Sequence, residues 1–337
     1  MATAWTADRV LKMASGYREA GVLAAAAELE LFDALRGRRL GASEIAARVR
    51  GNVRAVAVLL DALAAMGLLK KSAGCYSVPA DVVSVLTAAG GRTVLAMTQH
   101  DANCMRRWAQ LARVARTGRP ARRVPSVRGA RGDAASFIGG MHDLNSRRAP
   151  VIVRDLQPLP FTHLLDVGGA SGTWTIAFLK ANPSATATIF DLPHVIPMTR
   201  RRLAGTRWRR RVRLVAGDFG RDELPEGADL AWVSAIIHQN SRPQNRELFR
   251  KVNRALKPGG RIAIRDVVMR QSRTAPLSGA LFAVNMLVGT RGGGTFTLGE
   301  IRSDLLQAGF RRVRLARRGE GRNEDPEIDG VFIICVE

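Results

Sequence analysis

Three acidic residues in the second half of the chain each follow an apolar run at the point where it ends. Asp166 stands just before the glycine-rich segment Gly168–Gly172, and Asp191 and Asp218 follow the next two runs. If these runs are parallel strands, the three carboxylates meet at the sheet edge where open α/β folds bind ligands. Helix capping explains any one of them but not the set. We therefore expect one ligand site here.

The segment Gly168-Gly169-Ala170-Ser171-Gly172 predicts a tight turn from a strand into a helix, because glycine lets the backbone turn sharply and approach a ligand. It lacks the lysine of a phosphate-binding P-loop and has only part of the dinucleotide pattern Gly-x-Gly-x-x-Gly. An acidic residue ahead of the glycines suits a cationic ligand better than a pyrophosphate. S-adenosylmethionine (SAM) carries an ammonium and a sulfonium, so we assign it here, with Asp166, Gly168, Gly169 and Gly172.

The next two acidic positions suit the other half of the same cofactor. The carboxylate of Asp191 can accept the two hydroxyls of a ribose, and Leu192 is assigned beside it. Asp218 can bond the amino group of adenine while the ring of Phe219 packs on its face. These residue types predict an adenosyl site.

His238 is the candidate general base. It follows the apolar run 230–237, and histidine is the side chain that most often serves as a general base, which suits removal of a proton from a phenol. Asp266, at the end of the next predicted strand, can hold the ring and stabilise the imidazolium. A lone histidine after a strand ordinarily has a structural role, so the hypothesis rests on the pair. Methyl transfer from a sulfonium needs no metal, and no ligand cluster at metal spacing is present.

From His163 onward, apolar runs alternate with helical patterns, which is typical of an open parallel sheet. Strands are predicted at 163–167, 185–190, 212–216, 230–234, 261–265, 312–316 and 331–336. Helices are predicted at 173–181, 193–203, 242–256 and 298–308.

The N-terminal part predicts a winged helix. Helical spacing over 5–35, a short helix from Ser43 and a longer one capped by Asn52 precede a hairpin over 68–78. Such a module binds DNA or pairs protomers. The first reading would use Arg48, Arg50 and Arg54. The second rests on the long apolar faces of 5–35, which so small a module cannot bury, and we expect a homodimer.

Length alone predicts two domains. We expect a winged-helix dimerisation domain over 1–91, a helical linker that contributes to an acceptor pocket over 92–155, and a SAM-binding catalytic domain over 156–337. Breaks are expected in the linker at 118–120 and 125–132.

Six motifs resemble, in order and spacing, the plant caffeate-type and bacterial natural-product O-methyltransferases, which include acetylserotonin and hydroxyneurosporene methyltransferases. The motifs are Asp166-Val167-Gly168-Gly169, Phe190-Asp191-Leu192-Pro193-His194-Val195-Ile196, Gly217-Asp218-Phe219, Ile237-His238, Leu256-Lys257-Pro258-Gly259-Gly260 and Ala308-Gly309-Phe310. The resemblance covers nearly the whole chain. It implies a class I methyltransferase fold (a doubly wound Rossmann-like sheet) with an N-terminal dimerisation domain, and a small, aromatic, hydroxylated acceptor. It also implies the same SAM contacts and the His238–Asp266 pair.

The acceptor side departs from the family pattern. The chain has Gln239 after the histidine, Thr295 in place of a second supporting Glu, and Ser234 where plant members have a Lys near the cofactor. The resemblance places Met141 near the site, although Ile138 replaces an Asn of that motif. Acceptor-pocket candidates are Met141, Phe282, Asn285 and Met286, of which Phe282 and Met286 equally suit an ordinary core.

The net charge of +23 raises a nucleic-acid alternative, either a winged-helix regulator or an RNA methyltransferase. The 46 Arg against 6 Lys are spread over the chain, with dense stretches at 200–213 and 311–318 that read as solvated basic surface. The Asn/Asp-Pro-Pro-aromatic motif of RNA base methyltransferases is replaced by Ile236-Ile237-His238-Gln239. Transfer to nitrogen or carbon, a member that no longer methylates, and a dehydrogenase remain as enzyme alternatives. No signal or membrane segment is visible and the three cysteines are scattered, so a cytoplasmic location is expected.

Overall fold

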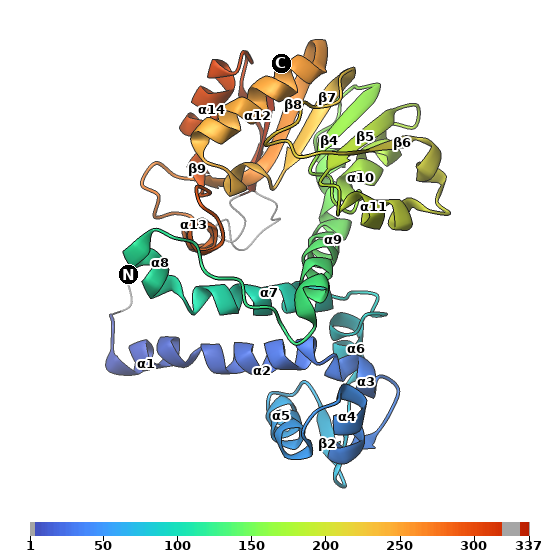
Figure 1. Cartoon of the computed structure of the whole chain (residues 1–337), viewed down its shortest axis with the longest axis vertical. Coiled ribbons are helices and arrows are strands. Elements are labelled where there is room, and N and C mark those ends of the chain that lie inside the picture. Colours follow the sequence, from blue (N-terminus) through green and yellow to red (C-terminus); the bar gives the residue numbers. More distant parts are fainter. Residues whose placement is uncertain (1–3, 319–330, 337) are drawn as a thin grey trace. The chain divides into compact units, whose positions relative to one another are not determined.

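The computed structural model describes residues 4–318 and 331–336 (Figure 1). Residues up to Arg106, together with Arg123–Leu144, form one compact unit. Arg107–Arg122 and the residues from Asn145 onward form the other. The long helix α9 (Gly129–Asp155), which contains Pro150, contributes to both units. The domain limits at 91 and 155 stay a prediction.

The first unit holds the winged helix. Helices α3 (Leu31–Leu35), α4 (Ala42–Val49) and α5 (Val53–Ala65) pack against a three-stranded antiparallel sheet in the order β1-β3-β2. As predicted, the side chain of Asn52 accepts the N–H of Ala55 and caps α5. The other elements are β1 (Leu40–Gly41), β2 (Lys70–Ser72), β3 (Cys75–Ser77), α6 (Ala80–Leu86) and α7 (Leu95–Trp108).

The helical pattern over 5–35 is interrupted twice. It forms α1 (Ala7–Ser15), α2 (Tyr17–Glu28) and α3, with a break at Gly16 and another at Glu30, whose φ is 56°. No residue of α1 is buried in the single chain. Large apolar side chains of this segment therefore lie on the surface, namely Trp5, Val10, Leu11, Met13 and Tyr17. Such a face fits an interface with a second protomer.

The second unit is built on one twisted sheet in the order β10-β11-β8-β7-β4-β5-β6. The strands from β4 to β8 are parallel, and β11 runs antiparallel between β8 and β10. The strands are β4 (His163–Val167), β5 (Thr186–Asp191), β6 (Val212–Ala216), β7 (Ala228–Ser234), β8 (Leu256–Met269), β10 (Arg314–Arg318) and β11 (Val331–Val336). The short β9 (Phe296–Thr297) pairs with the end of β8.

Helices cover both faces of the sheet (Figure 1). One face packs on α10 (Thr173–Ala181) and α11 (Ile196–Leu203), and the other on α12 (Arg242–Ala255) and α14 (Leu298–Gln307). Two further helices are α8 (Leu111–Thr117) and α13 (Leu277–Gly289). This is the predicted doubly wound class, so the fold prediction is confirmed. In the described part of the chain, no helix has the length and hydropathy to cross a membrane.

Three of the boundaries that differ from the prediction lie in β8, β10 and α11. Strand β8 begins at Leu256 and continues to Met269, so Asp266 lies inside the strand and not at its end. Strand β10 begins two residues late, at Arg314, after Arg312 adopts a φ of 55°. Residues 193–195 form a turn, and α11 begins only at Ile196.

Candidate active site

The glycine loop joins β4 to α10 and leaves almost no room for side chains. Gly168 has a φ of +70°, and a Cβ added there would lie 2.4 Å from Cδ1 of Ile236. A Cβ on Gly169 would lie 2.8 Å from the carboxyl group of Asp166. Ala170 adopts a φ of 43°, which is uncommon for a residue with a side chain and typical of functional loops. Here the chain can bring bare backbone close to a ligand.

Asp166 lies beneath this loop and is 1% exposed. Its carboxyl group accepts a hydrogen bond from the hydroxyl of Thr175 in α10. Burial raises the pKa of Asp166 to about 7. The Thr175 hydroxyl that bonds this carboxyl group is uncharged. A cation bound beside Asp166 would therefore favour the ionised form of the carboxyl group.

Asp191 ends β5 and ties the glycine loop to that strand. One carboxylate oxygen accepts the N–H of Ala170 at 2.7 Å, and the other accepts the N–H of Leu192 at 2.7 Å. Burial raises the pKa of Asp191, and these two hydrogen bonds oppose the rise. Each oxygen keeps a second lone pair, so the carboxylate can still accept two hydroxyl groups.

A tight turn follows β6. The side chain of Asp218 accepts the N–H of Gly220 at 2.9 Å, and its carbonyl accepts the N–H of Asp222 at 2.7 Å. Lys251 of α12 donates to the carbonyl oxygens of Phe219, at 3.0 Å, and of Asp222, at 2.9 Å. Lys251 is 5% exposed. Sequence reasoning missed it, although a lysine three residues after Leu248, on the apolar stripe of α12, was a signal.

His238 and Asp266 form a buried pair. Nδ1 of the imidazole lies 2.7 Å from Oδ1 of Asp266, which also accepts the N–H of Val267 at 2.7 Å. The side chains are 11% and 1% exposed. A carboxylate on Nδ1 favours the tautomer with the proton on that atom, which leaves the Nε2 lone pair for another proton. The ring of Phe282 meets the imidazole edge to face, with centroids 4.8 Å apart.

The glycine run after α13 packs on the backbone of His238. Gly294 donates its N–H to the carbonyl of His238 at 2.9 Å, and a Cβ on Gly293 would lie 2.5 Å from that same oxygen. Thr295, at the position of the family's second Glu, is 5% exposed. The glycine run therefore supports the position of His238 through its backbone.

The acceptor-pocket candidates fall in different places. Phe282, Asn285 and Met286 lie on α13, and Met286 is 8% exposed. The amide oxygen of Asn285 accepts the indole N–H of Trp108 at 2.9 Å, a partner that sequence reasoning missed. Met141 lies on α9 in the other compact unit, and its place in the pocket stays a prediction.

Ser234 has a cationic neighbour on the next strand. It pairs with Arg265 of β8, whose guanidinium donates to the serine hydroxyl at 3.4 Å. Arg265 is 7% exposed and lies 4.8 Å from the ring centroid of Trp174. Arg265 therefore brings a positive charge next to Ser234 from the neighbouring strand. The described residues contain no group of three or more His, Cys, Asp or Glu that could hold a metal ion.

Comparison with known proteins assigns the family. Residues 127–311 match the model of the O-methyltransferase domain, and residues 11–89 match the O-methyltransferase dimerisation domain. The chain is 30% identical over 315 residues to 3-hydroxy-5-methyl-1-naphthoate 3-O-methyltransferase of Streptomyces sahachiroi, covering 90% of each chain. It is 29% identical over 328 residues to acetylserotonin O-methyltransferase of Gallus gallus, covering 92% of this chain and 94% of that one.

Solved structures of other methyltransferases have the same fold. PigF with S-adenosylhomocysteine (SAH) superposes with a TM-score of 0.84 at 26% identity, covering 99% of this chain and 100% of that one. Human N-acetylserotonin methyltransferase with SAM superposes with a TM-score of 0.77 at 24% identity, covering 100% and 99%, which supports the fold.

The chain belongs to the O-methyltransferase family, as the sequence motifs predicted. It is a SAM-dependent enzyme that transfers a methyl group to oxygen, and its dimerisation domain supports a homodimer.

Proposed function

We propose that this O-methyltransferase methylates a phenolic hydroxyl of a small aromatic metabolite, with His238 as the general base and Asp266 as its orienting partner. The observation that carries the proposal is the buried His238–Asp266 contact of 2.7 Å, flanked by the ring of Phe282. An aromatic wall beside the base suits a flat aromatic acceptor. The relatives named above methylate a hydroxynaphthoate and acetylserotonin, which are also aromatic.

The residues at the carboxyl edge of the sheet fit SAM. When bound, SAM supplies an electrophilic methyl group on a sulfonium. We assign the ribose to Asp191 and Leu192, the adenine to Asp218 and Phe219, and the methionine part to the glycine loop and Asp166. The fit rests on the absence of room for a Cβ at Gly168 and Gly169 and on the free lone pairs of Asp191. Ser234, beside the buried Arg265, is assigned to the same site.

In this scheme the acceptor hydroxyl gives its proton to Nε2 of His238. The charge of Asp266 stabilises the resulting imidazolium, as a carboxylate does in a catalytic triad. A general base of this kind contributes about 10²- to 10⁴-fold to the rate. The carboxylate of Asp266 also accepts the N–H of Val267, which helps to fix its orientation toward His238.

The experiment that tests the assignment is a screen of hydroxynaphthoates and N-acetylserotonin with SAM, read by mass spectrometry. O-methylated product is expected. Matched aminonaphthoates are the control, and methylation of the amines alone would contradict the proposed phenolic acceptor. We also propose that the enzyme works in the cytoplasm, a reducing compartment in which Cys75 and Cys104 would remain thiols.

The pKa of Asp166 predicts that SAH affinity depends on pH. Below pH 7 the carboxyl group is largely protonated, and a cationic amino group binds the ionised form better. The affinity is expected to rise by up to about tenfold per pH unit from pH 5.5 to the pKa of about 7, then to level off. Calorimetric titrations across this range measure it. Asp166→Asn should bind weakly with a flat profile, and a flat profile in the wild type would contradict the assignment.

Lys251 is expected to act as a positioning residue for the adenine turn. Lys251→Met removes the donors to the carbonyls of Phe219 and Asp222, so SAH should bind at least about tenfold more weakly while kcat at saturating SAM changes little. Lys251→Arg should restore part of the affinity, and the exposed Lys257→Met serves as a control. A lowered melting temperature with unchanged SAH affinity would show that Lys251 only stabilises the fold.

A further inference from the structure

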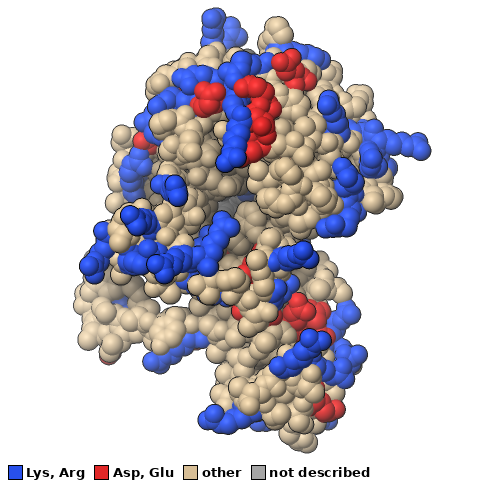
Figure 2. Space-filling view, viewed as in Figure 1, with Lys and Arg blue, Asp and Glu red and all other residues tan. Residues whose placement is uncertain are grey.

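An arginine-dense stretch leads into the edge strand β6. It lies at the amino ends of the parallel strands, whereas the active site lies at their carboxyl ends. The stretch comprises the last turn of α11 and the turn η1 (Arg207–Arg210) before β6. The side chains of Arg200, Arg201, Arg209 and Arg210 are exposed. Figure 2 shows Lys and Arg side chains gathered on the flank that carries α11 and β6. This positive surface plays no part in the chemistry assigned above.

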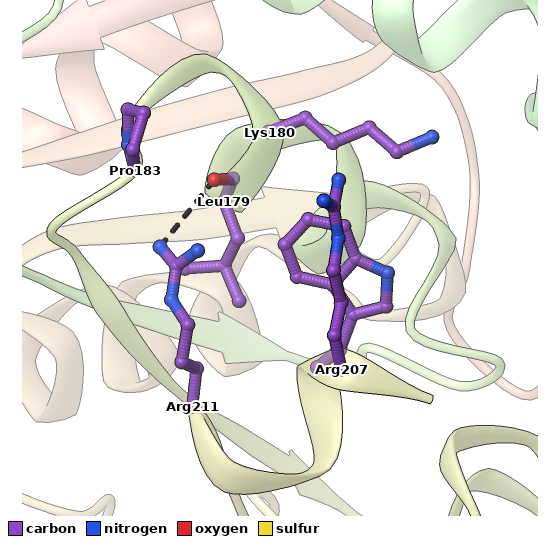
Figure 3. Close-up of a pocket in the computed structure, with 6 residues that line it drawn as sticks. Leu179, Lys180, Pro183, Arg207 and Arg211 are labelled. Atoms are coloured by element: carbon purple, nitrogen blue, oxygen red, sulfur yellow. Dashed lines mark hydrogen bonds between the residues drawn. The ribbon is translucent and has the colours of Figure 1, made fainter. Parts of the chain in front are cut away.

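A pocket of about 240 Å³ opens within this stretch (Figure 3). It is lined by Leu179, Lys180, Pro183, Arg207, Trp208 and Arg211. Three of these side chains are cations and three are apolar. The lining residues precede β5 and β6, whereas Asp191 is the last residue of β5. The length of this six-residue strand, roughly 20 Å, therefore separates the pocket from the ribose position.

The cations are arranged before any ligand binds. Arg211 donates Nε–H to the carbonyl of Ala185 at 2.9 Å and an Nη2–H to that of Asn182 at 2.8 Å, which fixes its guanidinium. Arg207 lies 4.3 Å from the ring centroid of Trp208. In Figure 3, Lys180 and Arg207 extend along one side of the pocket and Arg211 lies on the other. Within residues 4–318 and 331–336, no carboxylate forms an ion pair with any of these three.

We propose that this pocket binds the phosphate group of a small phosphorylated organic molecule. Three positive charges around one cavity favour a dianion over a monoanion. The guanidinium of Arg207 and the ammonium of Lys180 can donate to phosphate oxygens, while Arg211, whose Nε and Nη2 are bonded to backbone carbonyls, contributes mainly its charge. Pro183 and the small exposed part of Trp208 provide an apolar contact for a short hydrocarbon or for the edge of a ring beside the phosphate. The cavity is smaller than the roughly 300–1,000 Å³ of pockets that enclose whole drug-sized ligands, so it takes one such group.

The same surface could attract the phosphates of a nucleic acid, and the structure favours the small ligand. Single-stranded nucleic acids bind best where aromatic rings are open for base stacking. Trp208, the aromatic residue of this stretch, is 8% exposed and lies under Arg207. Its face is therefore not available to a base.

The test is calorimetric titration of the full-length protein with phenyl phosphate at low salt, alongside the indole N–H signals in an NMR spectrum. Saturable binding that shifts the Trp208 signal, assigned with Trp208→Phe, is expected. Inorganic phosphate should bind more weakly and benzyl alcohol should not bind. Equal affinity for inorganic phosphate would overturn the assignment to a phosphate ester.

Two charge-matched double variants localise the site. Lys180→Ser with Arg207→Ser should weaken phenyl phosphate binding at least tenfold, with SAH affinity unchanged. Arg209→Ser with Arg210→Ser removes the same charge outside the pocket and should change the affinity less than twofold. Equal losses in the two proteins would show a diffuse electrostatic attraction and overturn the proposal. Tighter binding of an oligothymidylate, weakened equally by both, would assign the surface to nucleic acid instead.

Discussion

Replacing His238 by alanine is expected to lower turnover by about 10²- to 10⁴-fold while leaving SAH affinity unchanged. The substitution removes the acceptor of the phenolic proton but touches none of the residues assigned to the cofactor. The imidazole contacts Asp266 and Phe282, both on the acceptor side of our scheme. Steady-state kinetics at saturating SAM, together with calorimetric titration of SAH, measure the two effects separately.

Two further variants test whether the effect is specific to the pair of His238 and Asp266. Asp266→Asn keeps the shape of the side chain but removes the charge that stabilises the imidazolium, so a large loss of turnover is expected again. His163→Gln changes a histidine at the opposite end of β4, where its ring contacts the hydroxyls of Thr186 and Thr188, and should leave turnover nearly normal. Near-normal turnover in His238→Ala would exclude the proposed base.

Replacing Asp191 by alanine is expected to weaken SAH binding by about 100-fold or more. The carboxylate is assigned two ribose hydroxyls, and hydrogen bonds to a charged group contribute about 1.5–3 kcal/mol each. The loss of two such bonds corresponds to at least about two powers of ten in affinity. The N–H groups of Ala170 and Leu192 also lose their acceptor, so the glycine loop loosens.

Calorimetric titration of SAH measures this effect. Asp191→Asn is the graded control, since its amide retains one acceptor oxygen and should bind with intermediate affinity. Unchanged SAH affinity in a folded Asp191→Ala protein would remove the ribose assignment and leave the glycine loop as the sole support for the site.

The sheet could be predicted because its strands are short apolar runs bounded by turns. Strands β4, β6 and β11 have the predicted limits, β5 is shifted by one residue at both ends, and β7 begins two residues early. The fold class also predicts which strands are neighbours. The contact between His238, which follows one strand, and Asp266, which lies on the next, could therefore be predicted. Local patterns thus located the candidate site, and its residue roles remain proposals.

Contacts between distant elements could not be predicted in this way. Nothing in the local sequence shows that Lys251 reaches the turn after β6, or that Trp108 holds Asn285. Arg265 also looked like one arginine among many, and only the register of β8 against β7 places it beside Ser234. Breaks such as the one at Glu30, where a non-glycine residue has a positive φ, depend on tertiary packing more than on propensity.

The most direct test of the account is the rate of methylation of a series of phenols of graded acidity by the wild type and by His238→Ala. If His238 removes the proton, the loss caused by the substitution should be large for phenols with a pKa near 10 and should shrink as the phenol becomes ionised at the assay pH. A loss of the same size across the series would contradict proton removal by His238 and leave the enzyme to work by positioning alone.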